Sequence, residues 1–409
     1  MTRIVAQSIV KGDEMKTQLS SKERMTAALE NQSPDHVPLC FMIFGALQSK
    51  CSGQPEFVRE QLALGLDAVV SLPSLPLHDP TETSDLPGLP VRFNPGVMTR
   101  EWREDLPGER YPLLHKEYTT PSGPLTTAVQ RSEDWPYKDH VPFLDDYLIP
   151  RSKKFLITEQ NDLECLQHLL RSPTPADIST FRENAMEAKK FAEEQHLLTT
   201  GGWGAGMDMA CWLCGMENLM FFTFDQPDFV HEMGAMLSNW NRSRMEIMLD
   251  AGLDLFIRRG WYENADFWPP EMYRKFILPD LKKDVALAHE TGAKFAYIMT
   301  SSSTPLLEMI VEAGVDVLVG IDPVQGNGTV LSEVKQAAAG NICLWGGVNG
   351  FVTVELGTEK QVRAAVTEAI QTLGPDGFIL SPVDNIRDES DKAWQNVLVF
   401  IQAWKETRG

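Results

Sequence analysis

Residues 294–323 read KFAYIMTSSSTPLLEMIVEAGVDVLVGIDP, and this stretch decides the fold. Residues 295–299 and 317–321 are short apolar runs of strand-forming residues, and the segment between them has the apolar spacing of an amphipathic helix. Thr304 and Pro305 can begin that helix, and a glycine can end it. Two strands joined by a helix over so short a segment predict a parallel βαβ unit, whose polar loop at the carboxyl end of the first strand is a usual place for chemistry.

The same alternation of apolar runs and helical patterns extends over most of the chain. The eight strand-like runs lie at 37–43, 68–72, 197–200, 253–258, 295–299, 317–321, 342–345 and 377–380. Eight strands separated mainly by helices predict an α/β fold, the (β/α)8 TIM barrel. We expect one barrel domain over residues 20–409 and a flexible N-terminal arm at 1–19. A Gly-x-Gly-x-x-Gly motif follows none of these runs, so the sequence does not favour a dinucleotide-binding fold.

Residues 73–150 interrupt this alternation after the second strand. The segment is rich in proline, glycine and charged residues, and its strand-prone pieces at 116–120 and 125–129 flank a Pro-Ser-Gly turn. A structureless loop of this length is uncommon in a compact domain. We therefore expect an inserted, hairpin-rich excursion that forms a rim or lid of the active site.

Composition limits the class of partner. The 409 residues carry a formal net charge of -20, which argues against nucleic acid or an anionic membrane as a partner, because both attract basic surfaces. Apolar runs stay far below the roughly 18 residues that a membrane helix needs. Six cysteines in a chain that lacks the pattern of a secretory signal predict free thiols and a cytoplasmic location.

In a barrel the carboxyl ends of the strands meet at one mouth, so side chains there are candidates for catalysis and binding. The acid–base groups at these ends are Glu263, Asp266, Tyr297, Asp322 and Asp384. The candidates for substrate binding are Trp203, Trp261, Tyr262, Thr300, Trp345, Asn349 and Asn385. Burial among aromatic rings can raise the pKa of a carboxyl group and make it an acid or base. Each carboxylate could instead cap a helix or shape a turn, and each tryptophan could be core packing.

Several longer segments resemble a known family. They are HVPLCFMIF at 36–44, TPLLEMIVEAGVDVL at 304–318, and LWGGVNGFVTVELGTEKQVRAAVTEAIQTLGPDGFILSP at 344–382. These segments resemble the uroporphyrinogen decarboxylase superfamily, which includes cobamide-dependent methyltransferases. The resemblance covers most of residues 20–405, is strongest in the C-terminal half, and implies a (β/α)8 barrel.

The chain departs from two branches of that superfamily. In the decarboxylases, the segment just after the first strand looks like Arg-Gln-Ala-Gly-Arg. The corresponding residues here, 44–48, read FGALQ and contain no arginine. In the thiol methyltransferases, the segment after the fifth strand looks like His-x-Cys-Gly, and the loop after the eighth strand carries a further cysteine. The histidine and the two cysteines of these segments hold zinc. Here the two places read IMTS at 298–301 and SPVDN at 381–385, so a metal site and zinc are not expected.

The resemblance therefore implies a corrinoid-dependent methyltransferase. It would move a methyl group between a small methyl donor, such as a methyl ether, and a cobamide on a separate corrinoid-binding protein or another carrier. The acid–base groups would activate the leaving group or the acceptor, and the tryptophans would hold the substrate away from water. Two alternative functions stay open: a decarboxylase acting on a smaller acid, and a non-catalytic binding protein that lost the family metal site. The protein could also form a homo-oligomer.

Overall fold

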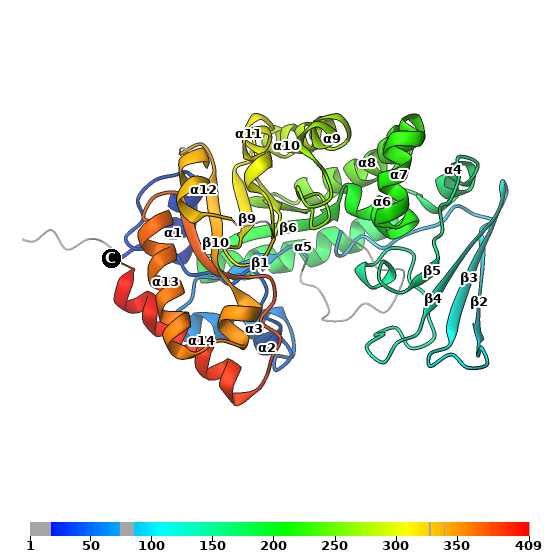
Figure 1. Cartoon of the computed structure of the whole chain (residues 1–409). Coiled ribbons are helices and arrows are strands. Elements are labelled where there is room, and N and C mark those ends of the chain that lie inside the picture. The colour runs from blue at the N-terminus through cyan, green and yellow to red at the C-terminus, as the bar shows by residue number, and fades with distance from the viewer. Residues whose placement is uncertain (1–17, 74–85, 327–328, 339, 409) are drawn as a thin grey trace, which may run out of the picture.

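The computed structural model describes residues 18–73, 86–326, 329–338 and 340–408 (Figure 1). Seven parallel strands form one curled sheet in the order β1-β6-β7-β8-β9-β10-β11. Their bounds are β1 (Val69–Ser71), β6 (Leu198–Ala205), β7 (Leu255–Arg259), β8 (Lys294–Ile298), β9 (Val317–Ile321), β10 (Cys343–Asn349) and β11 (Phe378–Val383). Each pairs with its sequence neighbour in the sheet, as the βαβ pattern predicts. Of the predicted arm at 1–19, residues 1–17 lie outside the described residues.

The run predicted as the first strand, at 37–43, is not a regular strand. It makes isolated parallel bridges to β11 and its continuation, from Leu39 to Leu380 and from Ile43 to Asn385. On its other side, the carbonyl of Leu39 accepts a hydrogen bond from the backbone N–H of Asp67, which precedes β1, at 2.8 Å. The segment therefore links the two edges of the curled sheet.

Side-chain acceptors explain why this segment does not form a continuous ladder. The N–H of Leu39 donates to Asp67 Oδ2 at 3.1 Å, and the N–H of Met42 donates to Ser381 Oγ at 2.8 Å. Pro38 has no N–H to donate. With these backbone donors taken up by side chains or missing, only the two bridges remain.

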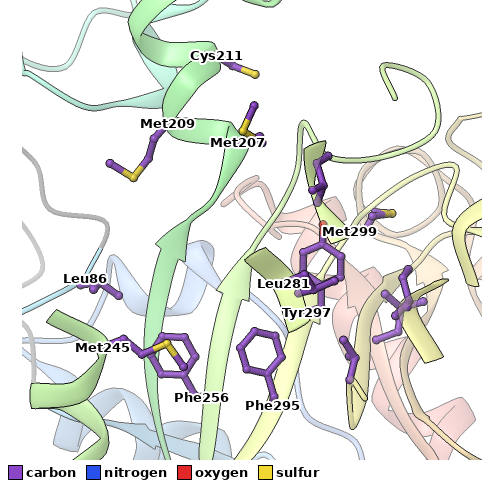
Figure 2. Close-up of a cluster of buried hydrophobic side chains, with 14 of the residues drawn as sticks. Leu86, Met207, Met209, Cys211, Met245, Phe256, Leu281, Phe295, Tyr297 and Met299 are labelled. Atoms are coloured by element: carbon purple, nitrogen blue, oxygen red, sulfur yellow. The ribbon is translucent and has the colours of Figure 1, made fainter. Parts of the chain in front are cut away.

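Side chains alternate between the inside of the curled sheet and the helices outside it. On β7, Leu255 and Ile257 face the interior cluster, whereas Phe256 packs in the larger cluster between sheet and helices. Figure 2 shows Phe256 beside Phe295 of β8, with ring centroids 5.9 Å apart. Because of this alternation, only every second residue of a strand can point towards the inside of the curled sheet.

Helices cover the outside of the sheet. The longer ones are α5 (Pro175–Gln195), α8 (Pro227–Leu249), α10 (Leu278–Glu290), α13 (Glu359–Leu373) and α14 (Asp391–Thr407). Gly215 separates two consecutive helices, α6 (Met207–Cys214) and α7 (Met216–Asp225), because its φ of +80° lies outside the helical range. No helix in the described ranges is long and apolar enough to cross a membrane.

The amino end of the curled sheet is filled by α1 (Ser21–Leu29). Ser20 and Glu23 form the capping box that begins this helix. Met25, Ala28 and Leu29 are buried in the interior cluster with residues from the beginnings of several strands. Apolar side chains thus close this end, and the opposite end holds the strand termini that the sequence singles out.

Between β1 and β6 the chain forms a second, antiparallel sheet of four strands. Its order is β2 (Met98–Glu104), β3 (Leu113–Thr120), β4 (Gly123–Gln130) and β5 (Ser152–Lys154). Figure 1 shows this sheet projecting to one side of the parallel sheet, close to α4 (Asp162–Leu166). Its buried side chains, including Tyr118 and Val129, belong to the same core cluster as the helices outside the parallel sheet.

Candidate active site

Two neighbouring cavities open at the carboxyl ends of the strands. The inner cavity has a volume of about 330 Å³, and among the described residues its lining carries no charged side chain. It is lined by Ile43, Gln48, Ser71, Leu72, Pro73, Pro87, Thr200, Gly201, Gly202, Trp203 and Ile257. A concave, mainly apolar pocket with a few polar groups is the usual form of a small-molecule site.

The outer cavity is larger and charged. It has a volume of about 490 Å³ and is lined by Ile43, Asp134, Asp146, Tyr147, Arg151, Trp261, Asp384, Asn385 and Arg387. Ile43 lines both cavities, and the Trp203 and Trp261 rings stand edge to face with centroids 5.7 Å apart. The mouth therefore combines an apolar inner part with a polar outer part.

The backbone at the end of β6 places Trp203 beside the inner cavity. The pairing of β6 with β7 shifts register between Gly202 and Ala205. Gly202 has φ +101°, and Trp203 has φ +95°, an uncommon conformation for a residue with a side chain. Ser302 and Asp384, also beyond the ends of strands, have positive φ values of 45° and 66°. Such strained residues concentrate at functional sites.

We expect Gly202→Ala to destabilise the protein by about 2–4 kcal/mol and to displace Trp203. A Cβ at Gly202 would lie 2.2 Å from the carbonyl oxygen of Ile257, and it would also have to adopt positive φ. Gly96→Ala is the matched control, because Gly96 has φ +93° but nothing within 4 Å of its Cβ position. Urea unfolding of both variants measures the difference; equal losses would contradict the predicted clash.

Arg259, which no sequence motif singles out, lies among three tryptophans, two of which line the cavities. Its guanidinium carbon is 4.5 Å from the Trp261 ring centroid, 4.8 Å from that of Trp212 and 5.8 Å from that of Trp203. Two carboxylates face it, from Asp208 at 3.7 Å and from Asp146 at 3.5 Å. Arg259 follows Leu255 and Ile257 at two-residue steps, so the alternation of β7 carries the signal that could have found it.

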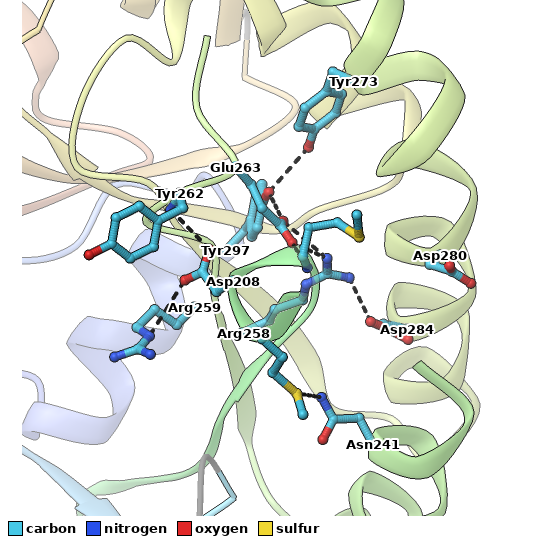
Figure 3. Close-up of polar contacts among 12 residues, drawn as sticks. Asp208, Asn241, Arg258, Arg259, Tyr262, Glu263, Tyr273, Asp280, Asp284 and Tyr297 are labelled. Atoms are coloured by element: carbon cyan, nitrogen blue, oxygen red, sulfur yellow. Dashed lines mark hydrogen bonds and ion pairs between the residues drawn. The ribbon is translucent and has the colours of Figure 1, made fainter. Parts of the chain in front are cut away.

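Asp208 is a second residue that no sequence motif singles out. Its buried carboxylate accepts the backbone N–H groups of Trp261 and Tyr262 at 3.0 and 2.9 Å and pairs with Arg259 (Figure 3). Burial raises the pKa of Asp208 to about 7, and Glu263 adds to this rise while Arg259 opposes it. Asp208 thus holds the loop that carries Trp261. It is far from that loop in sequence, so no local pattern could reveal the contact.

Glu263 and Tyr297 lie in a buried network outside the cavities (Figure 3). Arg258 donates to both oxygens of Glu263 at 2.8 and 3.0 Å and to Asp284 of α10 at 2.6 Å. The Tyr297 hydroxyl donates a hydrogen bond to Glu263, and the backbone N–H of Met207 donates a second one to Glu263 Oε1 at 2.7 Å. Burial raises the pKa of Tyr297 well above its ordinary value. Neither side chain lines the inner or the outer cavity, and Tyr297 shares the helix-facing side of β8 with Phe295.

Asp322 and Asn349 also meet each other rather than either cavity. Asn349 Nδ2 donates to Asp322 Oδ2 at 2.7 Å, and Asp322 Oδ1 accepts the N–H groups of Val324 and Gln325. Burial raises the pKa of Asp322, and these hydrogen bonds oppose that rise. The pair connects the ends of β9 and β10. Asp322 therefore shapes a turn, which is the structural role that the sequence left open beside a catalytic one.

The remaining candidates are spread around the mouth. Asp266 is exposed and accepts hydrogen bonds from Ser302 Oγ at 2.7 Å and Ser301 Oγ at 3.3 Å. Trp345 is buried inside the sheet, where its indole N–H donates to the carbonyl of Cys40 at 2.9 Å. Thr300 and Tyr262 are half-buried and line neither cavity.

Asp384 is the acid–base candidate that lines the mouth. It follows β11, is half-buried, and makes no ion pair with any residue that the structure describes. Burial raises the pKa of Asp384, and the nearby Arg387 opposes this rise. Asn385 accepts the N–H of Gly45 at 2.9 Å and so fixes the loop against α2 (Gly45–Gln48). Asp384 also occupies the position where the resemblance places the cysteine of thiol methyltransferases.

The donors for a metal ion are sparse. Within residues 18–73, 86–326, 329–338 and 340–408, no group of three His, Cys, Asp or Glu side chains is placed to hold one. Ile298, at the place of the family histidine, is buried in the interior cluster. The six cysteines are buried free thiols, and burial raises the pKa of the Cys211 and Cys214 thiols.

A curled parallel sheet with covering helices, and cavities at the carboxyl ends of its strands, defines an α/β protein of the barrel type with its site at the mouth. The chain belongs to the uroporphyrinogen decarboxylase (URO-D) family, whose model matches residues 143–406. A methyltransferase from Methanosarcina mazei has a similar fold: the two chains are 16% identical over 95% of this chain and 98% of that one, with a TM-score of 0.58.

A B12-independent methionine synthase from a Shewanella species is 11% identical over 58% of this chain and 66% of that one, with a TM-score of 0.39. A comparison with curated protein sequences gives no significant match.

Proposed function

We propose that this protein is a methyltransferase that moves a methyl group from a small methyl donor, such as a methyl ether, to a corrinoid carried by a separate protein. The observation that carries the proposal is Asp384, a half-buried carboxyl group of raised pKa that lines the outer cavity, which shares Ile43 with the uncharged inner cavity. Membership of the URO-D family and the fold shared with a methyltransferase support it.

Breaking the bond between a methyl group and oxygen leaves an electron pair on the oxygen, which must gain a proton to leave as a neutral alcohol or phenol. A carboxyl group whose proton is held more tightly than usual can act as the general acid that supplies it. The raised pKa and accessible position of Asp384 suit this role. The corrinoid, as the second substrate, supplies the cobalt nucleophile that accepts the methyl group.

The inner cavity suits an uncharged, preferably flat, group. Trp203 contributes an aromatic side chain to the lining, and Ile43, Leu72 and Ile257 supply apolar surface. Its lining offers no basic side chain among the described residues, unlike a site for a porphyrinogen with eight carboxylates. Methyl transfer therefore fits this cavity better than decarboxylation of such a substrate.

The test is a spectroscopic assay with the purified protein, a reduced corrinoid protein and a panel of methyl ethers. Methyl transfer predicts conversion of the cob(I)alamin-type spectrum to that of methylcobalamin, together with release of one demethylated product for each methyl group. Carbon dioxide release from an acid substrate would instead favour the decarboxylase alternative. Binding without turnover for every donor and corrinoid protein would favour the non-catalytic alternative.

A further inference from the structure

The outer cavity contains two arginines, and among the described residues only the Arg151 side chain is held by hydrogen bonds. Arg151 donates to Asp134, to Ser132 Oγ at 2.8 Å and to the Tyr147 carbonyl at 3.2 Å. Its guanidinium also lies 4.8 Å from the Tyr147 ring centroid. These contacts use most of its donors, so Arg151 shapes the wall of the cavity rather than offering a free binding group.

The acidic residues of this cavity divide in the same way. Asp134 is held by Arg151, and Asp146 accepts the indole N–H of Trp212 at 2.9 Å and faces Arg259 at 3.5 Å. Asp384 makes no ion pair with a described residue. The groups left for a ligand are therefore one carboxyl group, Asp384, and one cation, Arg387, which lie three positions apart on the same loop.

Arg387 projects from a loop that is fixed by its backbone. Its N–H and that of Asp388 both donate to the buried carboxylate of Glu355, the latter at 2.8 Å. The Arg387 side chain is exposed and lines the outer cavity, and its guanidinium forms no hydrogen bond or ion pair with any residue in the described ranges. A guanidinium on a fixed backbone is well suited to bind a carboxylate through two parallel hydrogen bonds.

We propose that Arg387 determines substrate specificity by binding a carboxylate group of the methyl donor. This inference rests on the proposed function and narrows it to one class of substrate: a flat, apolar methyl ether that carries a carboxylate. The apolar part would occupy the inner cavity, the carboxylate would pair with Arg387 in the outer cavity, and the reacting oxygen would come near Asp384. The two cavities, which share Ile43 as a lining residue, match the two chemical halves of such a molecule.

Calorimetric binding of two probes tests this inference without any turnover. The probes are 3-methoxybenzoate and 3-methoxybenzamide, whose two substituents can point to the same side of the ring, and which have nearly the same shape but differ in charge. We expect the unmodified protein to bind the carboxylate at least about tenfold more tightly than the amide. Arg387→Gln should raise the Kd of the carboxylate by about 10–100-fold and leave that of the amide within about twofold, and Arg387→Lys should keep part of the preference.

Arg363→Gln is the matched control, because Arg363 is a surface arginine on α13 that pairs with Glu406 and lines neither cavity. Equal binding of the two probes, a preference that survives Arg387→Gln, or no binding of either probe at millimolar concentration would each overturn the inference. The proposed function fails separately: Arg387-dependent binding without methyl transfer would refute methyl transfer alone. Transfer from uncharged ethers with no effect of Arg387→Gln would refute only the role of Arg387.

Discussion

Asp384→Asn is expected to lower kcat for the proposed methyl transfer by about 10²–10⁴-fold, the usual contribution of a positioned general acid. Asparagine has the same shape but cannot donate a carboxyl proton to the leaving oxygen. It also accepts positive φ more readily than most residues, so the loop with φ +66° at this position should keep its conformation. Single-turnover kinetics with a methyl ether and a reduced corrinoid protein measure the change.

The pH dependence gives this prediction a second readout. Asp384 must be protonated to act as the acid, so the rate of the unmodified enzyme should fall as pH rises through the pKa of Asp384. Burial raises that pKa, Arg387 lowers it, and Asp322 and Glu355 raise it, so the fall should come above the ordinary range of an aspartate. The variant should lose this limb of the profile.

Two outcomes would contradict the role of Asp384. One is a variant with nearly full activity towards ethers whose leaving groups need a proton. The other is an equal loss in Asp388→Asn, the matched control. Asp388 lies on the same loop but lines neither cavity, and its contact with the N–H of Ser390 can be kept by an asparagine oxygen.

Arg258→Met is expected to reduce the free energy of unfolding by about 3–5 kcal/mol, the usual loss when one partner of a buried ion pair is removed. Glu263 is fully buried, and Asp284 is mostly buried, so both would lose their shared cation in a place that water does not reach. Guanidinium unfolding at neutral pH measures this change as a shift of the midpoint with an unchanged slope.

Arg363→Met is the control for this second prediction. It breaks the exposed pair with Glu406, which should cost no more than about 1 kcal/mol. A loss in Arg258→Met as small as that of the control would show that the Arg258 network is not needed for stability. A large loss together with full activity in the remaining folded protein would agree with a network that supports the site without contacting substrate.

The sequence predicts the strands well because their apolar runs and the turns between them are local features. The seven strands of the parallel sheet, β1 and β6 to β11, each overlap one of the predicted runs. The run at 37–43 does not form the regular strand that its apolar residues predict, because two of its N–H groups bond to Asp67 and Ser381, which are distant in sequence. An apolar run alone does not reveal such side-chain acceptors.

The candidate site was predicted less completely, for two physical reasons. Strand ends are easy to find, but a shift of one residue sends a side chain to the opposite face, and this separates Arg259 from Arg258. The second reason is long-range contact. Asp208 supports Trp261, and Asp146 of the inserted segment faces Arg259, through contacts that no spacing in the sequence encodes.

The apolar closure by α1 has a consequence for the order of events during turnover. Met25, Ala28 and Leu29 block the amino end, so the route to the described cavities runs through the mouth. A macromolecule that covers the mouth would trap whatever lies inside. For the proposed methyl transfer we therefore expect compulsory-order kinetics, in which the small donor enters before a carrier protein docks and the demethylated product escapes only after the carrier departs. An excess of carrier should then slow turnover by blocking both entry and exit.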